Sequence, residues 1–379
     1  MVERSSAVDF RIPLSRPDVG EAERRAVVEV LESGRLSLGP KVPEFEAALA
    51  RRAAVAHAVA TSSGTAALHL AVRVLGLGPR DEVVTTPFSF VASSNCLLFE
   101  GVRPVFVDEE PDTLNIDPAL VGEALTERTR AILAVDVFGH PADWPGLRRL
   151  ADERGVRLIE DAAEALGSAL GGRPAGGLGD MGIFGFYPNK QITTGEGGAL
   201  VTNDASIAEL CASLRNHGRA ADGDLWIEHK RLGYNYRLSD VACALGLAQL
   251  ERLDEMMERR ARVAAGYDQR LAGLDALRRP SVRDGVRLSW FVYVVRLADE
   301  YTRADRDRIM AGLRARGIGC RNYFPLIHLQ PFYRERFGCG PGDFPVAEAA
   351  AERTIALPFF SGLSEAEVDE VVSSLRELL

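Results

Sequence analysis

The sequence has few cysteines and no long apolar segment. Its five cysteines are scattered through 379 residues without a C-x-x-C pair, so we expect reduced, mostly buried thiols, no disulfide framework and no bound metal. The apolar runs are far shorter than the ~20 residues of a membrane span, and residues 1–11 lack the apolar core of a secretion signal. We therefore expect a cytoplasmic protein with no membrane partner.

Positive charge is also in short supply. Lysine and arginine number 45 against 54 acidic residues, which gives a net charge of -9. No long basic run offsets this balance, so most of the surface would repel a nucleic acid backbone. We expect no nucleic acid partner, and an anionic small ligand would need cations gathered at its own site.

The remaining composition is that of a globular protein. Hydrophobic residues make up 46% of the chain and charged residues 26%, and the length allows two domains. Between residues 55 and 205, short apolar runs alternate with amphipathic stretches, which predicts a mostly parallel sheet covered by helices, with ligands at the carboxyl ends of its strands. A helical stretch, 238–274, leads into a smaller α/β domain whose last helix begins after Ser364 as its N-cap. We divide the chain into 1–255 and 256–379.

Two motifs follow apolar strands in the first domain. In "TSSGTAALHLAV" (61–72), the hydroxyls of Ser63 and Thr65 and the N–H groups of a helix start would suit a phosphate. Taken alone, this motif is more often a plain N-cap. In "VRLIEDAAEALGS" (156–168), the strand ends in Glu160 and Asp161. One of these acids faces a site, or both belong to a solvated helix start.

Lys190 follows a third strand, in "FGFYPNKQITTGEGG" (184–198). An isolated lysine in a loop is most often an exposed charge. A phosphate cradle, a strand-end carboxylate and a strand-end amine are, however, the three parts that a pyridoxal phosphate site requires. Phe88 and Phe90, in "TTPFSFVAS" (85–93), offer the aromatic ring that would stack on such a cofactor.

These motifs and their order resemble the DegT/StrS family of sugar aminotransferases. The resemblance runs through "PLSRPDVGEAE", "GRLSLGP", "TSSGTAALHLA", "PVFVDEEPDTLNIDP", "IEDAAEALGS", "LRNHGR", "GYNYRLSD" and "YFPLIHLQPFY", and covers essentially the whole chain. It implies a fold type I pyridoxal phosphate-dependent transferase, with a large cofactor-binding domain and a smaller C-terminal α/β domain. It also implies nucleotide-linked keto sugars as substrates.

The resemblance implies roles for individual residues. Lys190 and Asp161 would be the catalytic pair, with Lys190 forming the Schiff base and Asp161 facing the pyridinium nitrogen. Further cofactor contacts would come from Gly64, Thr65 and Ala66 at the phosphate, Phe90 on the ring, Glu164 at the hydroxyl edge, and Asn235 from a neighbouring subunit. Ser37, His328, Arg219 and Tyr323 would lie near the substrate, although a single arginine is more often a solvated or structural charge. The reach of Asn235 implies an obligate homodimer with shared active sites.

One position departs from the family pattern. Many relatives have a serine where this chain has Gly185, and that hydroxyl helps to hold the phosphate. We therefore do not expect a side-chain ligand from this position.

The implied activity moves an amino group from L-glutamate to a nucleotide-linked keto sugar, with pyridoxamine phosphate as the intermediate form of the cofactor. The "GYNYRLSD" form is similar to members that aminate C4 of 4-keto-6-deoxyhexoses, whereas C3 enzymes tend to have a serine in place of Tyr236. A C3 sugar or cyclitol (inosose) aminotransferase is an alternative, and so is a non-catalytic regulatory protein that binds the cofactor. A sugar 3-dehydratase would have a histidine in place of Lys190.

Overall fold

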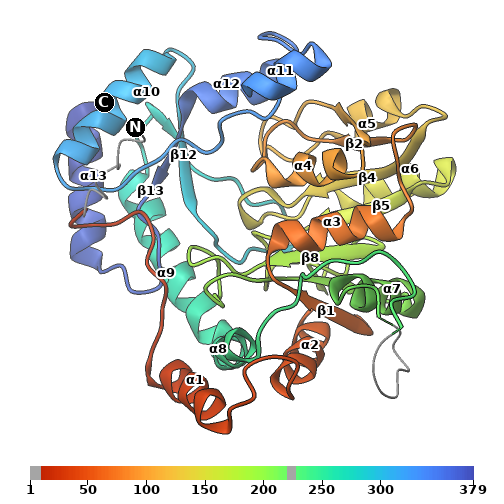
Figure 1. The fold of residues 1–379 in the computed structure, drawn as a ribbon. Helices are drawn as coiled ribbons and strands as arrows, with labels where there is room; N and C mark the ends of the chain where they lie inside the picture. Colours follow the sequence, from red (N-terminus) through yellow and green to blue (C-terminus); the bar gives the residue numbers. More distant parts are fainter. Residues whose placement is uncertain (1–9, 220–227) are drawn as a thin grey trace, which may run out of the picture.

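A seven-stranded sheet forms the centre of the computed structural model, which describes residues 10–219 and 228–379 (Figure 1). Its strands lie in the order β1 (His57–Thr61), β9 (Gly198–Thr202), β8 (Met181–Gly185), β5 (Arg157–Asp161), β4 (Thr129–Val135), β2 (Glu82–Thr85) and β3 (Arg103–Phe106). The five strands from β8 to β3 are parallel, and β9 runs antiparallel to both of its neighbours. The expectation of a mostly parallel sheet is confirmed.

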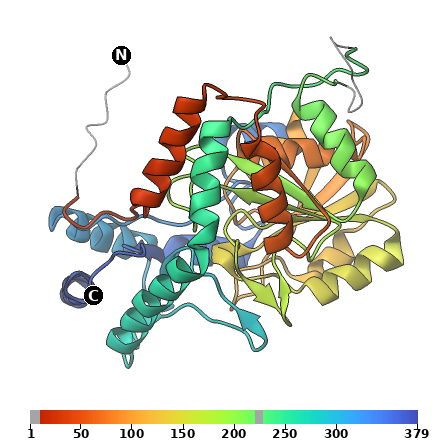
Figure 2. The same ribbon diagram turned by 90° about the horizontal axis from the view of Figure 1, so that it is seen from below.

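Helices cover both faces of this sheet. One face packs against α3 (Gly64–Val74), α4 (Ala92–Phe99) and α7 (Ala205–Arg215), and the other against α2 (Lys41–Arg52), α5 (Pro118–Ala124), α6 (Trp144–Arg154) and α8 (Asp240–Glu251). Alternate residues of β4 show why its sequence is apolar throughout: Leu133 packs in the core on the first face, and Ile132 in the core on the second. Seen from below, α8 lies between α1 (Glu21–Ser33) and α2 (Figure 2).

A second, smaller sheet organises the C-terminal part of the chain. It consists of β10 (Leu277–Arg278), β12 (Tyr293–Leu297) and β13 (Thr354–Leu357), all antiparallel. The helices here are α9 (Leu253–Leu271), α10 (Arg303–Ala315), α11 (Pro331–Phe337), α12 (Pro345–Arg353) and α13 (Glu365–Leu378), and a short ribbon joins β6 (Ala169–Leu170), β7 (Arg173–Pro174) and β11 (Val286–Arg287). Ser364 caps α13, as its sequence predicts, by accepting a hydrogen bond from the Glu367 N–H at 3.3 Å.

The long helix α9 belongs to both cores. Met256 near its start packs in the large-domain core, whereas Val263 and Tyr267 pack in the core of the C-terminal domain. The N-terminal segment also reaches the C-terminal domain, because Ile12 is buried in that core and pairs with Ile318. The division at residue 255 stays a prediction.

All five cysteines are free thiols, and four of them are buried. The expectation of mostly buried thiols is confirmed. Across residues 10–219 and 228–379, no helix combines the length and the apolar character needed to cross a membrane.

Candidate active site

The predicted motifs meet at the carboxyl edge of the large sheet. Strands β5 and β8 are parallel neighbours, so the residues that follow them, including Lys190, lie on the same edge as Asp161. Helix α3 starts beside them, since a Cβ placed on Gly64 would lie 3.4 Å from the Cα of Gly185. Three segments far apart in sequence therefore share one site.

Asp161 is the acid that faces this site. Its Oδ2 accepts a hydrogen bond from the Ser93 hydroxyl at 2.7 Å, and its Oδ1 accepts one from the Ala163 N–H at 3.2 Å. Burial raises the pKa of Asp161, and those two donors and the charge of Lys190 oppose this effect. A positively charged donor opposite Asp161 would offset the cost of keeping this buried carboxylate ionised.

Glu160 serves the other side of the strand. Its carboxylate accepts hydrogen bonds from the N–H groups of Leu178 at 2.7 Å and Gly179 at 3.1 Å. These bonds close the loop before β8. The two adjacent acids thus divide between structure and site, because successive side chains of a strand point to opposite faces.

Lys190 is not a solvated loop charge. Its side chain is 16% exposed, and its Nζ lies 3.5 Å from Glu164 Oε1. The same Nζ lies 4.1 Å from the centroid of the Phe291 ring. Glu164 is held in turn by the Phe138 N–H, which donates to its Oε2 at 2.9 Å. The amine therefore rests between a carboxylate and an aromatic ring.

The start of α3 is capped by a side chain and also has backbone N–H groups that are free to bind an anion. Ser63 is the N-cap, and its Oγ accepts the Ala66 N–H at 3.0 Å. The N–H expected from Ala66 at a phosphate is therefore taken by Ser63 in this structure. The N–H groups of Gly64 and Thr65, in the first turn, have no intrahelical partner and remain the donors for an anion.

The two candidate phenylalanines have different environments. Phe88 is fully buried against Phe138 and Phe324, whereas Phe90 is 64% exposed. Phe90 also follows Ser89, whose hydroxyl lies 2.9 Å from that of Ser93, the partner of Asp161. The exposed ring is thus the one available for stacking, on a loop tied to the buried carboxylate.

Asn235 lies in a segment, 228–237, that pairs with residues 216–219 and contacts α3. We call these two paired stretches the arm. It is exposed and pairs with Asn216, and the rings of Tyr234 and Tyr236 on either side of it stack at 4.8 Å. The Tyr236 hydroxyl lies 2.9 Å from Nδ1 of the buried His69 of α3. Asn235 is therefore exposed, whereas the tyrosines on either side of it pack against His69 of α3.

The four predicted substrate residues are not gathered in one place. Tyr323 lies beside the site: burial raises its pKa, with Glu164 as a further cause. Ser37 lies on an exposed loop that Asp240 holds by accepting the Gly39 N–H at 2.7 Å. Arg219 lies on the same arm as Asn235.

His328 does not reach an open surface. Its side chain has no exposed area, its Nε2 lies 3.2 Å from Glu348 Oε1, and its ring packs edge-on against Phe344. Packing between the loop and α12 covers the imidazole here, and the sugar contact that the resemblance implies stays a prediction.

Some residues of the site had no signal in the sequence. Ser93 is one serine among several in a small-residue run, and Phe291 precedes a strand of the C-terminal domain. Neither has a local pattern that distinguishes it from a packing residue. Only the folded chain brings Phe291 to Lys190.

The residues present fit pyridoxal phosphate. Asp161 is a buried acid in need of a cationic partner, Lys190 is a sheltered amine, and the start of α3 has donors to spare for a phosphate. An exposed ring, that of Phe90, stands on the adjoining loop. The fold and the site together are those of a pyridoxal phosphate-dependent transferase.

Comparison with known proteins identifies the family. Residues 17–376 match the sequence profile of the DegT/DnrJ/EryC1/StrS aminotransferase family. The chain belongs to this family, and it is a pyridoxal phosphate-dependent sugar aminotransferase. The resemblance seen in the sequence is thereby confirmed.

Individual relatives match over nearly their whole length. Spore coat polysaccharide biosynthesis protein SpsC of Bacillus subtilis (strain 168) is 36% identical over 377 residues, with 97% of each chain covered. GDP-perosamine synthase of Caulobacter vibrioides is 38% identical over 371 residues, covering 97% of this chain and 98% of the relative. The putative sugar aminotransferase Spr1654 from Streptococcus pneumoniae, in its PLP-form, superimposes with a TM-score of 0.92 at 29% identity, covering 97% of this chain and 99% of that one. Spr1654 has also been solved in its PMP-form.

Proposed function

We propose that this enzyme moves the amino group of L-glutamate to C4 of a nucleotide-linked 4-keto-6-deoxyhexose. The similarity to GDP-perosamine synthase supports a nucleotide sugar as the acceptor. The exchange balances without an external oxidant or reductant: the donor loses its amine and becomes a keto acid, while the sugar carbonyl carbon is reduced and gains that amine.

The observation that carries the proposal is the position of Lys190. Its amine is sheltered beside Glu164, on the same sheet edge as the buried Asp161. The presence of both Lys190 and the buried Asp161 favours a catalytic protein over one that only binds the cofactor. A dehydratase of this family would have a histidine here.

Each residue then has a defined task. Bound pyridoxal phosphate supplies a ring that accepts electrons from the carbon losing its proton. Lys190 would hold the cofactor through its amine, and the free Nζ would carry the proton between two carbons. Asp161 keeps the ring nitrogen protonated, with each pKa unit worth about 1.4 kcal/mol of preference for that form. Gly64 and Thr65 hold the phosphate through backbone N–H groups, joined by the Thr65 hydroxyl. Phe90 covers the ring.

The proposal that the amine goes to C4 of the sugar depends on Tyr236, which lies in the arm beside Asn235. Tyr236, which distinguishes the C4 pattern from the C3 pattern, directs its hydroxyl to His69 at 2.9 Å. Its influence on the sugar would therefore be indirect, through the placement of the adjacent Asn235. We propose that Asn235 completes the phosphate site of a second subunit in a homodimer of the cytoplasm.

Product analysis tests this function. The enzyme is incubated with L-glutamate and, in parallel, with keto sugars linked to dTDP, UDP and GDP, C3 and C4 ketones of each, and an inosose. Mass spectrometry should find the amine product from a C4 nucleotide sugar. A product only from the inosose would show that the acceptor is a cyclitol. A product from a C3 ketone would show that the amine goes to C3 of the sugar. No product from any acceptor would favour the non-catalytic regulatory protein.

A further inference from the structure

Arg260 of α9 is a buried cation with an unusual set of partners. It is 3% exposed, and its hydrogen bonds go to three backbone carbonyls: Lys190 O at 3.2 Å, Phe291 O at 3.1 Å and Trp290 O at 3.3 Å. Across the described residues it forms no ion pair with a carboxylate, and burial lowers its pKa to about 10. Burying a cation without a carboxylate partner is unfavourable, so we expect Arg260 to have a specific role at this position.

Two of the three partners of Arg260, Lys190 and Phe291, meet at the amine. Lys190 carries the amine, and Phe291 carries the ring whose centroid lies 4.1 Å from Nζ. Lys190 belongs to the large domain, Phe291 precedes β12 of the C-terminal domain, and α9 belongs to both cores. One guanidinium thus joins the two domains at the lysine.

Neighbouring contacts keep this junction in place. The Gln191 amide donates to Glu164 O and, at 3.2 Å, to Ser289 O, so it ties the same two segments together. At the far end of the lysine segment, the Thr193 N–H donates to Gln249 Oε1 on α8 at 3.3 Å. The segment from Lys190 to Thr193 is therefore held at both ends by the helices α8 and α9.

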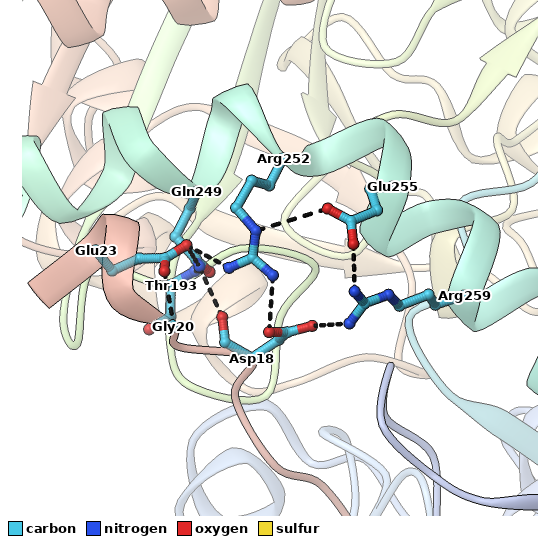
Figure 3. Close-up of polar contacts among 8 residues, drawn as sticks. All are labelled: Asp18, Gly20, Glu23, Thr193, Gln249, Arg252, Glu255 and Arg259. Atoms are coloured by element: carbon cyan, nitrogen blue, oxygen red, sulfur yellow. Dashed lines mark hydrogen bonds and ion pairs between the residues drawn. The ribbon is translucent and has the colours of Figure 1, made fainter.

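The helix that carries Arg260 is itself anchored. Figure 3 shows Arg252 and Arg259 reaching Asp18 of the N-terminal segment, at 3.0 and 3.2 Å. Gln249 also donates to Glu23 Oε1 at 2.7 Å. The start of α9 has little freedom to shift relative to the large domain.

We propose that Arg260 is a positioning residue that fixes Lys190 against Phe291, and that the Phe291 ring is the resting place of the free amine. This inference rests on the proposed function, because it concerns the same lysine. An ammonium over an aromatic face is stabilised without a covalent bond, so the ring keeps the released amine in one place between its two proton transfers.

The test uses apoprotein and does not depend on turnover. Wild-type protein and the variants Arg260→Met, Phe291→Leu and Phe291→Tyr are mixed with pyridoxal phosphate, and the rate of covalent attachment to Lys190 is followed by borohydride trapping and peptide mass spectrometry. Arg262→Met is the matched control: the same change two residues further along α9, at an exposed side chain outside the contacts described above.

We expect Arg260→Met and Phe291→Leu each to slow attachment by about tenfold or more, since a misplacement near 1 Å of a reacting group has effects of this size. Phe291→Tyr, which keeps the ring, and Arg262→Met should stay within about twofold of wild type. The double variant Arg260→Met/Phe291→Leu should be no slower than the worse single variant, because both changes remove the same arrangement.

Three results would overturn the inference: equal rates for Arg260→Met and Arg262→Met, equal rates for the leucine and tyrosine variants of Phe291, or effects that multiply in the double variant. If Arg260→Met does not fold, the Phe291 pair alone decides. If wild-type apoprotein itself fails to attach the cofactor at Lys190, the proposed function fails. Normal attachment by wild type together with indifferent variants refutes only the positioning role.

Discussion

Replacing Gly185 by serine should tighten the binding of pyridoxal phosphate. Gly185 ends β8, beside the start of α3, and a Cβ added to it would lie 3.5 Å from the Ala163 Cβ and 4.0 Å from the Gly64 Cα. Both distances are ordinary van der Waals contacts, so a side chain fits without moving the backbone. The new hydroxyl would stand close to the free N–H groups of Gly64 and Thr65.

The size of the effect follows from the bond that is added. A hydrogen bond to a charged group contributes about 1.5–3 kcal/mol, which corresponds to about a 10- to 100-fold lower Kd. Gly185→Ala is the control, because alanine fills the same space and restricts the unfolded chain in the same way but brings no hydroxyl. Both variants should also raise the free energy of unfolding of the apoprotein by about 0.4–1 kcal/mol through that restriction.

The assay is a titration of apoprotein with pyridoxal phosphate, read by its absorbance and by quenching of tryptophan fluorescence. We expect the serine variant to bind more tightly than wild type and the alanine variant to match wild type. Equal affinities for Gly185→Ser and Gly185→Ala would show that the phosphate does not lie beside this strand end. A loss of affinity in both would show that the space is needed for something else.

Three further substitutions test Lys190 and Asp161 of the site and Glu23 of α1. Lys190→Ala, purified from a host replete in vitamin B6, should carry no covalently attached cofactor and produce no amine from glutamate and keto sugar; full activity would remove the proposed mechanism. Asp161→Asn should lower kcat far more than cofactor affinity, because the amide cannot hold the ring nitrogen protonated; an unchanged kcat would contradict that role. Burial alone would raise the pKa of Glu23, but hydrogen bonds, led by that of the Gly20 N–H, outweigh it and lower the pKa. Its ionised form therefore stabilises the fold above the unfolded pKa of about 4.3, and this contribution is lost as pH falls through the folded value. Glu23→Gln should cost about 1–3 kcal/mol at pH 7 and progressively less below about pH 4; an equal cost at both pH values in denaturant titrations would refute this account.

The sequence by itself determined the sheet and the identity of the central residues. Apolar strands with helices between them can bury both faces only as a covered parallel sheet, and Asp161 and Lys190 follow strands that such a sheet must place side by side. The resemblance to a family added the expected chemistry, because so many motifs occur in a fixed order. These conclusions depend on local pattern and chain order, which a sequence contains.

What only the tertiary structure decided is the set of contacts between distant segments. Local pattern left Glu160 and Asp161 equivalent until the resemblance chose Asp161, and the pleat of β5 separates them into a loop anchor and a site residue. Local pattern likewise left Phe88 and Phe90 equal, and the burial of Phe88 agrees with the resemblance, which chose Phe90. For His328, the structure adds its packing against Phe344, which no local pattern indicated. No local sequence pattern distinguishes Arg260 or Phe291, because their roles depend on contacts with Lys190. These contacts form where the two domains pack together. Such packing is a property of the folded chain and not of any short stretch of sequence.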